Sequence, residues 1–189
     1  DIDLSEYINE FPLDGSDKDT AFRGTLDGNN HIITLNGDIN INNDTPNWNG
    51  SYKKEFNWSF SIFQNINSGV VRNIKFDGEL SFHDTSILSE TNRFWVSDII
   101  TLSVLACSIS GYKAEITNII NEIDISFDSL ENVTDVYIAP VAYTIEYAQI
   151  SKCINKGDIR VALKEKNPVY HMFKLEDWWV LRIVMHKII

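Results

Sequence analysis

The sequence predicts an all-β protein built from stacked repeats and closed by a different C-terminal segment. Four short segments share an acidic residue followed by an apolar–polar–apolar triplet. Apolar and polar residues alternate around these segments, and this period of two is typical of strands with one buried face. The charge also changes after residue 161: the part before it carries 11 Lys and Arg against 24 Asp and Glu, and the part after it five against three.

The repeat has four copies, at 36–41, 77–82, 122–127 and 156–161. Glycine and asparagine beside the copies indicate corners between short strands, because both residues accept positive φ. The alignment places Gly and an acid at equivalent positions in successive copies. We therefore assign a structural corner role to Gly37, Asp38, Gly78, Glu79, Asp124, Gly157 and Asp158.

The last three copies extend upstream, where Val71 corresponds to Ile116 and Ile150. Stacking such copies buries one continuous core, because each copy covers the apolar face of its neighbour. We therefore predict a repeat domain over residues 1–161 and a cap or tail over 162–189.

Two interruptions break the repeat, near 42–60 and 83–97. Insertions in stacked repeats leave the stack on one side and often carry binding. Both are rich in aromatic residues, which either contact a sugar or a protein, or cover an otherwise exposed strand. The candidate binding aromatics are Trp48, Tyr52, Phe56, Trp58 and Trp95.

The tail admits two interpretations. Residues 174–187 have acids near the start and bases near the end, which suits the dipole of a helix. Residues 178–184 also match a buried strand, and periodicity does not separate the two. Either element serves as a cap, which stacked repeats need because open sheet edges invite aggregation.

The net charge of −11 disfavours a nucleic-acid backbone or an anionic membrane as the main partner, because like charges repel. No apolar run reaches the roughly 20 residues that span a bilayer, so no transmembrane helix is expected. Two cysteines, Cys107 and Cys153, are too few for a disulfide framework. Their apolar neighbours favour buried thiols, with a disulfide between them as the alternative.

Three segments resemble the GLUG-type repeat family. The first comprises D-I-D-L at 1–4 and F-R-G-T-L-D-G-N-N-H-I-I at 22–33, and the others are I-F-Q-N-I-N-S-G-V-V-R-N-I at 62–74 and I-S-K-C-I-N-K-G-D-I at 150–159. The resemblance covers about residues 1–161. It implies a right-handed parallel β-helix from a secreted or surface protein, such as an adhesin or the non-catalytic part of an IgA-protease-like metallopeptidase.

Catalytic patterns are weak in this sequence. The four histidines include no H-E-x-x-H pair, and no G-x-S-x-G elbow occurs. The repeated acids would stack in a column at a spacing near that of a catalytic carboxylate pair. Recurrence, however, favours a structural corner role. Calcium is a weaker alternative at 27–30 and 14–19, whose acids also suit turns without metal.

These observations predict a non-catalytic extracellular or cell-surface module for scaffolding or adhesion, without a cofactor. We expect it to bind a glycan or a protein through its long loops. Two alternatives stay open. One is a self-assembling subunit of a filament or surface layer that associates through its ends. The other is a carbohydrate-active enzyme, either a polysaccharide lyase or a hydrolase.

Overall fold

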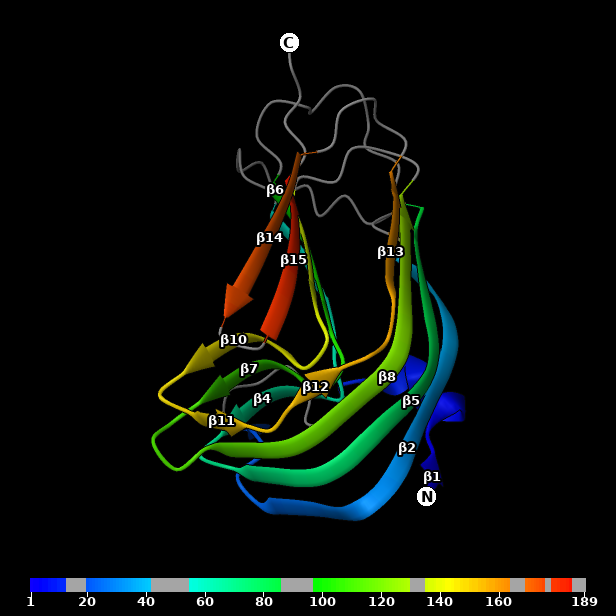
Figure 1. The fold of residues 1–189 in the computed structure, drawn as a ribbon. Coiled ribbons are helices and arrows are strands. Elements are labelled where there is room, and N and C mark those ends of the chain that lie inside the picture. The colour runs from blue at the N-terminus through cyan, green and yellow to red at the C-terminus, as the bar shows by residue number, and fades with distance from the viewer. Residues whose placement is uncertain are drawn as a thin grey trace.

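Strands form most of the chain that the computed structural model describes, and these strands make three sheets (Figure 1). A short 3₁₀ helix, η1 (Ser5–Glu10), lies near the N-terminus. The described residues are 1–12, 20–41, 55–85, 97–129, 135–163, 169–175 and 178–184. The all-β prediction is therefore confirmed for these residues.

The largest sheet, which we name the long sheet, is parallel throughout. Its order is β1, β2, β5 and β8, and three short strands pair along β8. The long sheet contains β1 (Ile2–Asp3), β2 (Thr25–Ile41), β5 (Val70–Asp84), β8 (Glu115–Ser129), β11 (Gln149–Ser151), β12 (Ile154–Asn155) and β13 (Ile159–Leu163). Its strands alternate between buried and more exposed residues, as one-sided burial requires.

The other two sheets lie between successive passes through the long sheet. The short sheet is parallel and contains β4 (Phe63–Asn67), β7 (Ala106–Ser110) and β10 (Ala142–Glu146). The mixed sheet contains β3 (Glu55–Phe60), β6 (Ser97–Ser103), β9 (Asp135–Ala139), β15 (Trp178–Val184) and β14 (Val169–Leu175). Strands β3, β6 and β9 pair in parallel.

The chain visits the long, mixed and short sheets in turn and then returns to the long sheet beside its previous pass. Thr25, Val70, Glu115 and Gln149 are register partners, so successive passes begin 45, 45 and 34 residues apart. Parallel neighbours joined in this way need long connections, and here the other two sheets supply them.

Left-handed backbone positions recur along the long sheet at residues that the repeat did not mark as corners. Asn73, Asn118 and Lys152 have φ of 56°, 55° and 54°, and asparagine tolerates this left-handed region. The Asn118 side-chain amide donates to Oδ1 of Asn73 at 2.9 Å. The bends therefore align from strand to strand.

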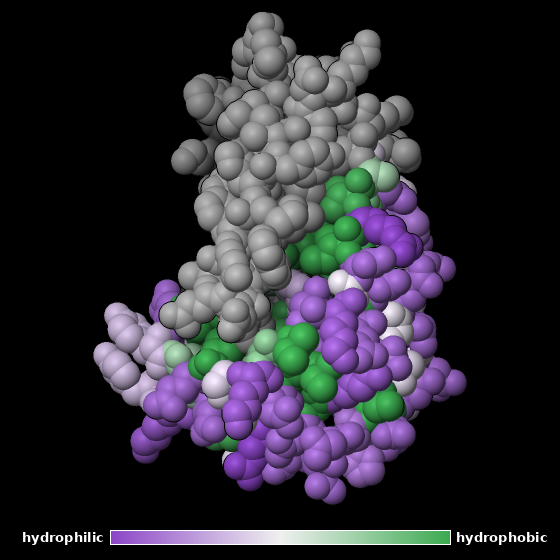
Figure 2. Space-filling model, viewed as in Figure 1, coloured by the Kyte–Doolittle hydropathy of each residue, from purple (hydrophilic) through white to green (hydrophobic). Residues whose placement is uncertain are grey.

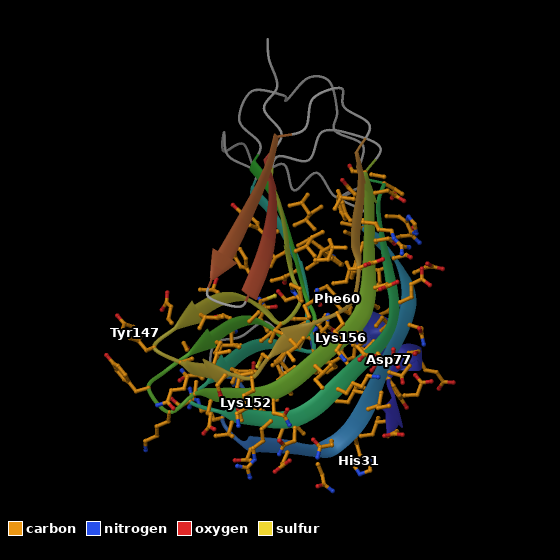
Figure 3. All side chains as sticks on the ribbon, in the orientation of Figure 1. His31, Phe60, Asp77, Tyr147, Lys152 and Lys156 are labelled. Atoms are coloured by element: carbon orange, nitrogen blue, oxygen red, sulfur yellow. The ribbon has the colours of Figure 1, made fainter. Side chains whose placement is uncertain are left out.

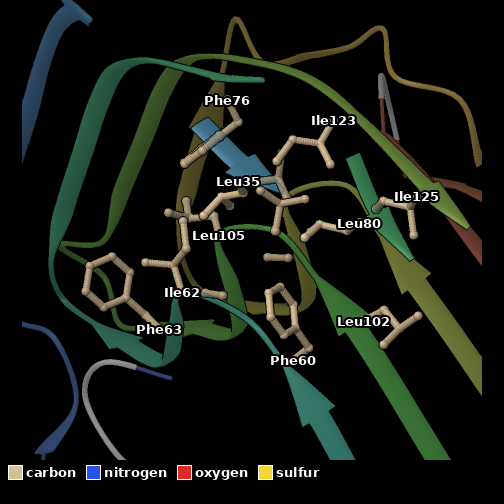
Figure 4. Close-up of a cluster of buried hydrophobic side chains, with 14 of the residues drawn as sticks. Leu35, Phe60, Ile62, Phe63, Phe76, Leu80, Leu102, Leu105, Ile123 and Ile125 are labelled. Atoms are coloured by element: carbon tan, nitrogen blue, oxygen red, sulfur yellow. The ribbon is translucent and has the colours of Figure 1, made fainter. Parts of the chain in front are cut away.

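The core fills the interior between the three sheets (Figure 4). Its largest fully buried side chains include Phe76, Phe82 and Phe127, of which the last two are register partners on β5 and β8. Burial of one large apolar side chain contributes about 1.5–3 kcal/mol. The alternation in the repeat thus points equivalent side chains of successive passes into the core, where they stack on one another.

The N-terminal segment covers the edge of β2. Leu4 donates its backbone N–H to the carbonyl of Thr34, and the hydroxyl of Ser5 accepts the backbone N–H of Asn36. A carboxylate oxygen of Asp1 accepts the N–H of Ile32 at 2.9 Å. Side chains thus satisfy edge amides that would otherwise be open to another strand.

The C-terminal segment is a hairpin of strands, so the helical interpretation of 174–187 is wrong. Strand β15 (Trp178–Val184) pairs antiparallel with both β14 and β9, which places it within the mixed sheet. The edge of β9 has backbone donors and acceptors that need a partner strand. A helix at this position would not pair with them. The competing prediction of a strand at 178–184 is confirmed.

Candidate functional site

The repeated acids line up on the outer surface of the long sheet. The register places Asn36, Glu79 and Asp124 side by side, and Asp158 follows next to Asp124. Oδ1 of Asn36 accepts the backbone N–H of Glu79 at 3.0 Å, and Oδ1 of Asp124 accepts that of Asp158 at 2.8 Å. Side chains in this column therefore bond successive strands to one another.

The first copy of the repeat is out of register with the others by two residues. Gly37 pairs with Leu80 rather than Gly78, and Asp38 pairs with Ser81 rather than Glu79. The irregularity lies between Asp27 and His31, where β2 contains two more residues than β5. Because a two-residue slip leaves every side chain on its own face, alternation alone could not reveal it.

The glycines of the repeat serve different purposes. A Cβ at Gly78 would lie 2.2 Å from the carbonyl oxygen of Leu35, and one at Gly157 would lie 1.9 Å from that of Ile123. Gly78 also has φ of +130°. At Gly37 the nearest atoms belong to the Ile8 side chain of η1, at 3.0 Å. Gly78 and Gly157 thus permit close backbone approach, whereas Gly37 gives room to the helix.

Ion pairs join the last three passes of the long sheet. Glu122 lies 2.6 Å from Nζ of Lys75 and 3.0 Å from Nζ of Lys156, which is labelled in Figure 3. Hydrogen bonds from these two lysines lower the pKa of Glu122, and the bond to Glu122 raises the pKa of Lys75. The charges in this region are therefore paired with one another. The face of the molecule seen in Figure 2 is mostly hydrophilic outside its green patches.

Asp27, in the calcium candidate at 27–30, already has three hydrogen-bond donors. Its carboxylate accepts Nε of Arg72 at 2.8 Å, the amide of Asn73 at 3.0 Å and the backbone N–H of Asn29 at 3.0 Å. The bonds from Asn73, Asn29 and Arg72, in that order, lower the pKa of Asp27 to about 2. Both oxygens of the Asp27 carboxylate thus have donors, and a calcium ion at this turn would have to displace them. The candidate at 14–19 lies outside the described residues.

A general acid in a glycosidase needs a carboxyl group with a raised pKa. Where the described carboxyl groups have a shifted pKa, at Asp3, Asp27 and Glu122, the shift is downward, and hydrogen bonds are its main cause. These groups are ionised near neutral pH. The partners of Asp27 and Glu122 come from neighbouring passes of the long sheet, so these two carboxylates connect strands, whereas Asp3 bonds the nearby Ser5.

Two histidines have carboxylate partners. Nδ1 of His83 lies 2.8 Å from Asp128, and Nε2 lies 3.9 Å from Asp38, so this imidazole connects β2, β5 and β8. His31 lies 3.3 Å from the carboxylate of Asp1. The two His83 contacts join paired strands of the long sheet, and the His31 contact joins the N-terminal residue to β2.

Both cysteines are buried thiols. Sγ of Cys107 lies 3.2 Å from Oγ of Ser61, and Sγ of Cys153 donates to the carbonyl oxygen of Ser151 at 3.2 Å. Burial raises the pKa of the Cys153 thiol, so it remains protonated at neutral pH. The structure contains no disulfide between Cys107 and Cys153, which was the alternative prediction.

The predicted binding aromatics divide into three groups. Trp58, on β3, is half-buried and meets Phe82 edge-to-face at 6.1 Å, so it covers the core. Phe56 lies on the same strand. The remaining candidates lie outside the described residues: Trp48, Tyr52 and Trp95. The strands β3 and β6 also occupy the ends of the two predicted interruptions, at 55–60 and 97.

One exposed aromatic pair escaped the sequence prediction. Tyr112 and Tyr147 are 78% and 69% exposed, and their ring centroids lie 5.0 Å apart. They are 35 positions apart in the sequence, and each lies just beyond the end of a short-sheet strand. The only local signal is the turn sequence Ser-Gly-Tyr that ends at Tyr112. Only the stacking of successive passes brings the rings together.

No family model matches this chain, and neither a curated protein nor a solved structure matches it. Within the described ranges, no cluster of three or more His, Cys, Asp or Glu side chains is placed to hold a metal ion. The same part of the chain contains no helix with the length and apolar character to cross a bilayer.

Proposed function

We propose that the chain is a right-handed parallel β-helix that acts as a non-catalytic scaffolding or adhesion module outside the cell or at its surface. The order in which the chain visits its sheets supports a helical coil with three sides. The resemblance of residues 1–161 to the GLUG family supports a place among secreted and surface proteins. This proposal includes membership of that family.

The observation that carries the non-catalytic role is the use of the acid column. A side-chain oxygen of Asn36, and likewise of Asp124, accepts a backbone N–H of the next strand. Arg160 lies 3.0 Å from Asp158 and 3.7 Å from Asp124. Acids committed to stacking and ion pairs form a solvated surface. A glycosidase instead uses one unrepeated pair of carboxyl groups.

The test combines binding and catalysis on the purified chain. We expect retention on immobilised host-matrix proteins or oligosaccharides, and no product from a panel of polysaccharides. The variants Glu79→Gln and Asp124→Asn serve as controls, since each keeps its size. Release of sugar that either variant abolishes, with its fold intact by circular dichroism, would overturn the proposal in favour of a carbohydrate-active enzyme.

A second candidate function is self-assembly through the ends of the stack. On β11–β13 the last pass has no further strand partner among the described residues, and Ile154 is 50% exposed there. Residues 149–163, which form this pass, carry Lys152, Lys156 and Arg160 against one acid, Asp158. The first 12 residues carry four acids and no Lys or Arg. Opposite charge favours a head-to-tail contact between copies.

Such a contact would rest on side chains, because Asp1 and Ser5 already satisfy edge amides at the N-terminal end. Light scattering at rising protein concentration tests it. We expect assembly that weakens with salt and is lost in Ile154→Lys. A monodisperse monomer at high concentration would exclude this candidate.

A further inference from the structure

The outer corner between the short and long sheets presents a pair of tyrosines to solvent. Tyr147 projects from the tip between β10 and β11, away from the core (Figure 3). The ring of Tyr112 lies beside it from the preceding pass, with an angle of 39° between the ring planes. We name these two residues the tyrosine corner, which here means only this exposed pair and not the Greek-key motif of the same name.

The backbone around the tyrosine corner is held on both sides. Gly111 donates its N–H to the carbonyl of Glu146 at 3.1 Å, and Gln149 donates to the carbonyl of Ala114 at 2.8 Å. Ala114 in turn donates to Gly111 at 2.8 Å. The rings are therefore presented by a fixed frame, which lowers the entropy lost when a ligand binds.

Tyr147 occupies a backbone conformation that a smaller residue would adopt more easily. Its φ is 58°, and the equivalent positions in the two earlier passes are Ser68 with φ of 59° and Gly111 with φ of 97°. A bulky side chain at positive φ is unusual, and strained residues gather at functional sites. Folding alone favours a small residue here, so the ring serves another purpose.

The size and surroundings of the tyrosine corner restrict its ligand. An aromatic side chain presents about 150–250 Å², so at 78% and 69% exposure the pair offers roughly 200–400 Å². One side of a stable protein interface buries about 800 Å². The neighbouring Lys113 and Glu146 are exposed, so the apolar surface ends at charged groups. A patch of this size, with hydroxyls beside ring faces, fits a small amphipathic ligand.

We propose that the tyrosine corner is a binding site for neutral glycans, with sugar rings stacked on Tyr112 and Tyr147. The negative face of an aromatic ring attracts the slightly positive C–H groups of a pyranose. The phenolic hydroxyls donate to and accept from sugar hydroxyls. Lys113 and Glu146 beside the rings have opposite charges, and the net charge of −11 disfavours uronic or sulfated glycans, so we limit the proposal to neutral sugars.

This site gives the proposed adhesion role a ligand class and rests on that role. It also moves the contact from the long loops to a corner between sheets. We expect a dissociation constant on the order of 1 mM for this site, because two rings contact only a few atoms of the sugar.

The experiment uses the full chain on an array of neutral oligosaccharides: β-1,4-glucans, galactans, mannans and N-acetylhexosamine oligomers. Hits are titrated by observing the tyrosine ring signals in NMR spectra. The variants are Tyr112→Ala and Tyr147→Asn, because asparagine tolerates positive φ and keeps the corner folded. Tyr7→Ala is the matched control, since Tyr7 is 49% exposed on η1, away from the corner.

We expect at least a tenfold weaker affinity in each corner variant and an unchanged affinity in the control. The thermal midpoint of Tyr147→Asn should equal or exceed that of the parent chain. Absence of any neutral glycan hit overturns the site, as does a hit that both corner variants retain. If the chain then still binds matrix proteins, the adhesion role survives without this site; loss of all binding removes both.

Discussion

Replacing Gly78 with alanine is expected to destabilise the protein by about 4 kcal/mol. Holding an alanine at φ of +130° costs about 1–3 kcal/mol. The new Cβ would also lie 2.2 Å from the carbonyl oxygen of Leu35, so the strands must move apart, and such overpacking costs about 1–3 kcal/mol more. This sum is a large part of the 5–15 kcal/mol that keeps a typical domain folded.

Urea unfolding followed by circular dichroism measures the loss as a lower midpoint at an unchanged slope. Gly37→Ala is the informative comparison, because its Cβ meets only the Ile8 side chain, at 3.0 Å, and that side chain can shift. We expect it to cost less than half as much as Gly78→Ala. Gly24→Ala, where ordinary contacts of 3.4 Å are available, should stay within about 1 kcal/mol of the parent.

Equal losses at Gly37 and Gly78 would refute the reasoning. They would mean that the two glycines occupy equivalent positions, as the sequence alignment predicted, and that the observed register is wrong. A loss below about 1 kcal/mol at Gly78 would show that the strands do not approach closely there.

Three further substitutions test the packing and the surface. Asp124→Ala should lower stability by about 1 kcal/mol in urea unfolding, because the Asp158 N–H loses its acceptor, whereas Asp124→Asn keeps an oxygen there and should match the parent. Asp27 has its pKa lowered from 3.8 to about 2, so its contribution is present above pH 4 and lost as the pH falls through 2; Asp27→Asn should flatten that part of a stability–pH profile, and an unchanged profile would contradict the assignment. Phe76→Ala should cost about 3–5 kcal/mol in thermal or urea unfolding, since Phe76 is fully buried, and a loss under 1 kcal/mol would exclude its place in the core.

The sequence by itself determined the strands and their buried faces. Alternation over 77–82 and 122–127 correctly matched Leu80 with Ile125 and Phe82 with Phe127. Upstream, it matched Val71 with Ile116. These matches succeeded because each pass presents the same inward positions to one core, so burial repeats in the sequence.

The candidate site was only partly available from the sequence. Three members of the acid column were aligned correctly, and Asp38 was not. The fourth member is Asn36, whose amide oxygen performs the same bond to the next strand that Asp124 performs. A search for repeated acids overlooks an amide, although both side chains offer the same acceptor.

The tertiary structure alone decided three features: the slip of the first copy, the pairing of the tail and the tyrosine corner. A two-residue slip preserves the inward and outward faces, so a pattern with period two carries no information about it. The tail became a hairpin because β9 offered an edge for β15 to pair with. Tyr112 and Tyr147 meet because successive passes stack, and that contact depends on the fold rather than on any local sequence pattern.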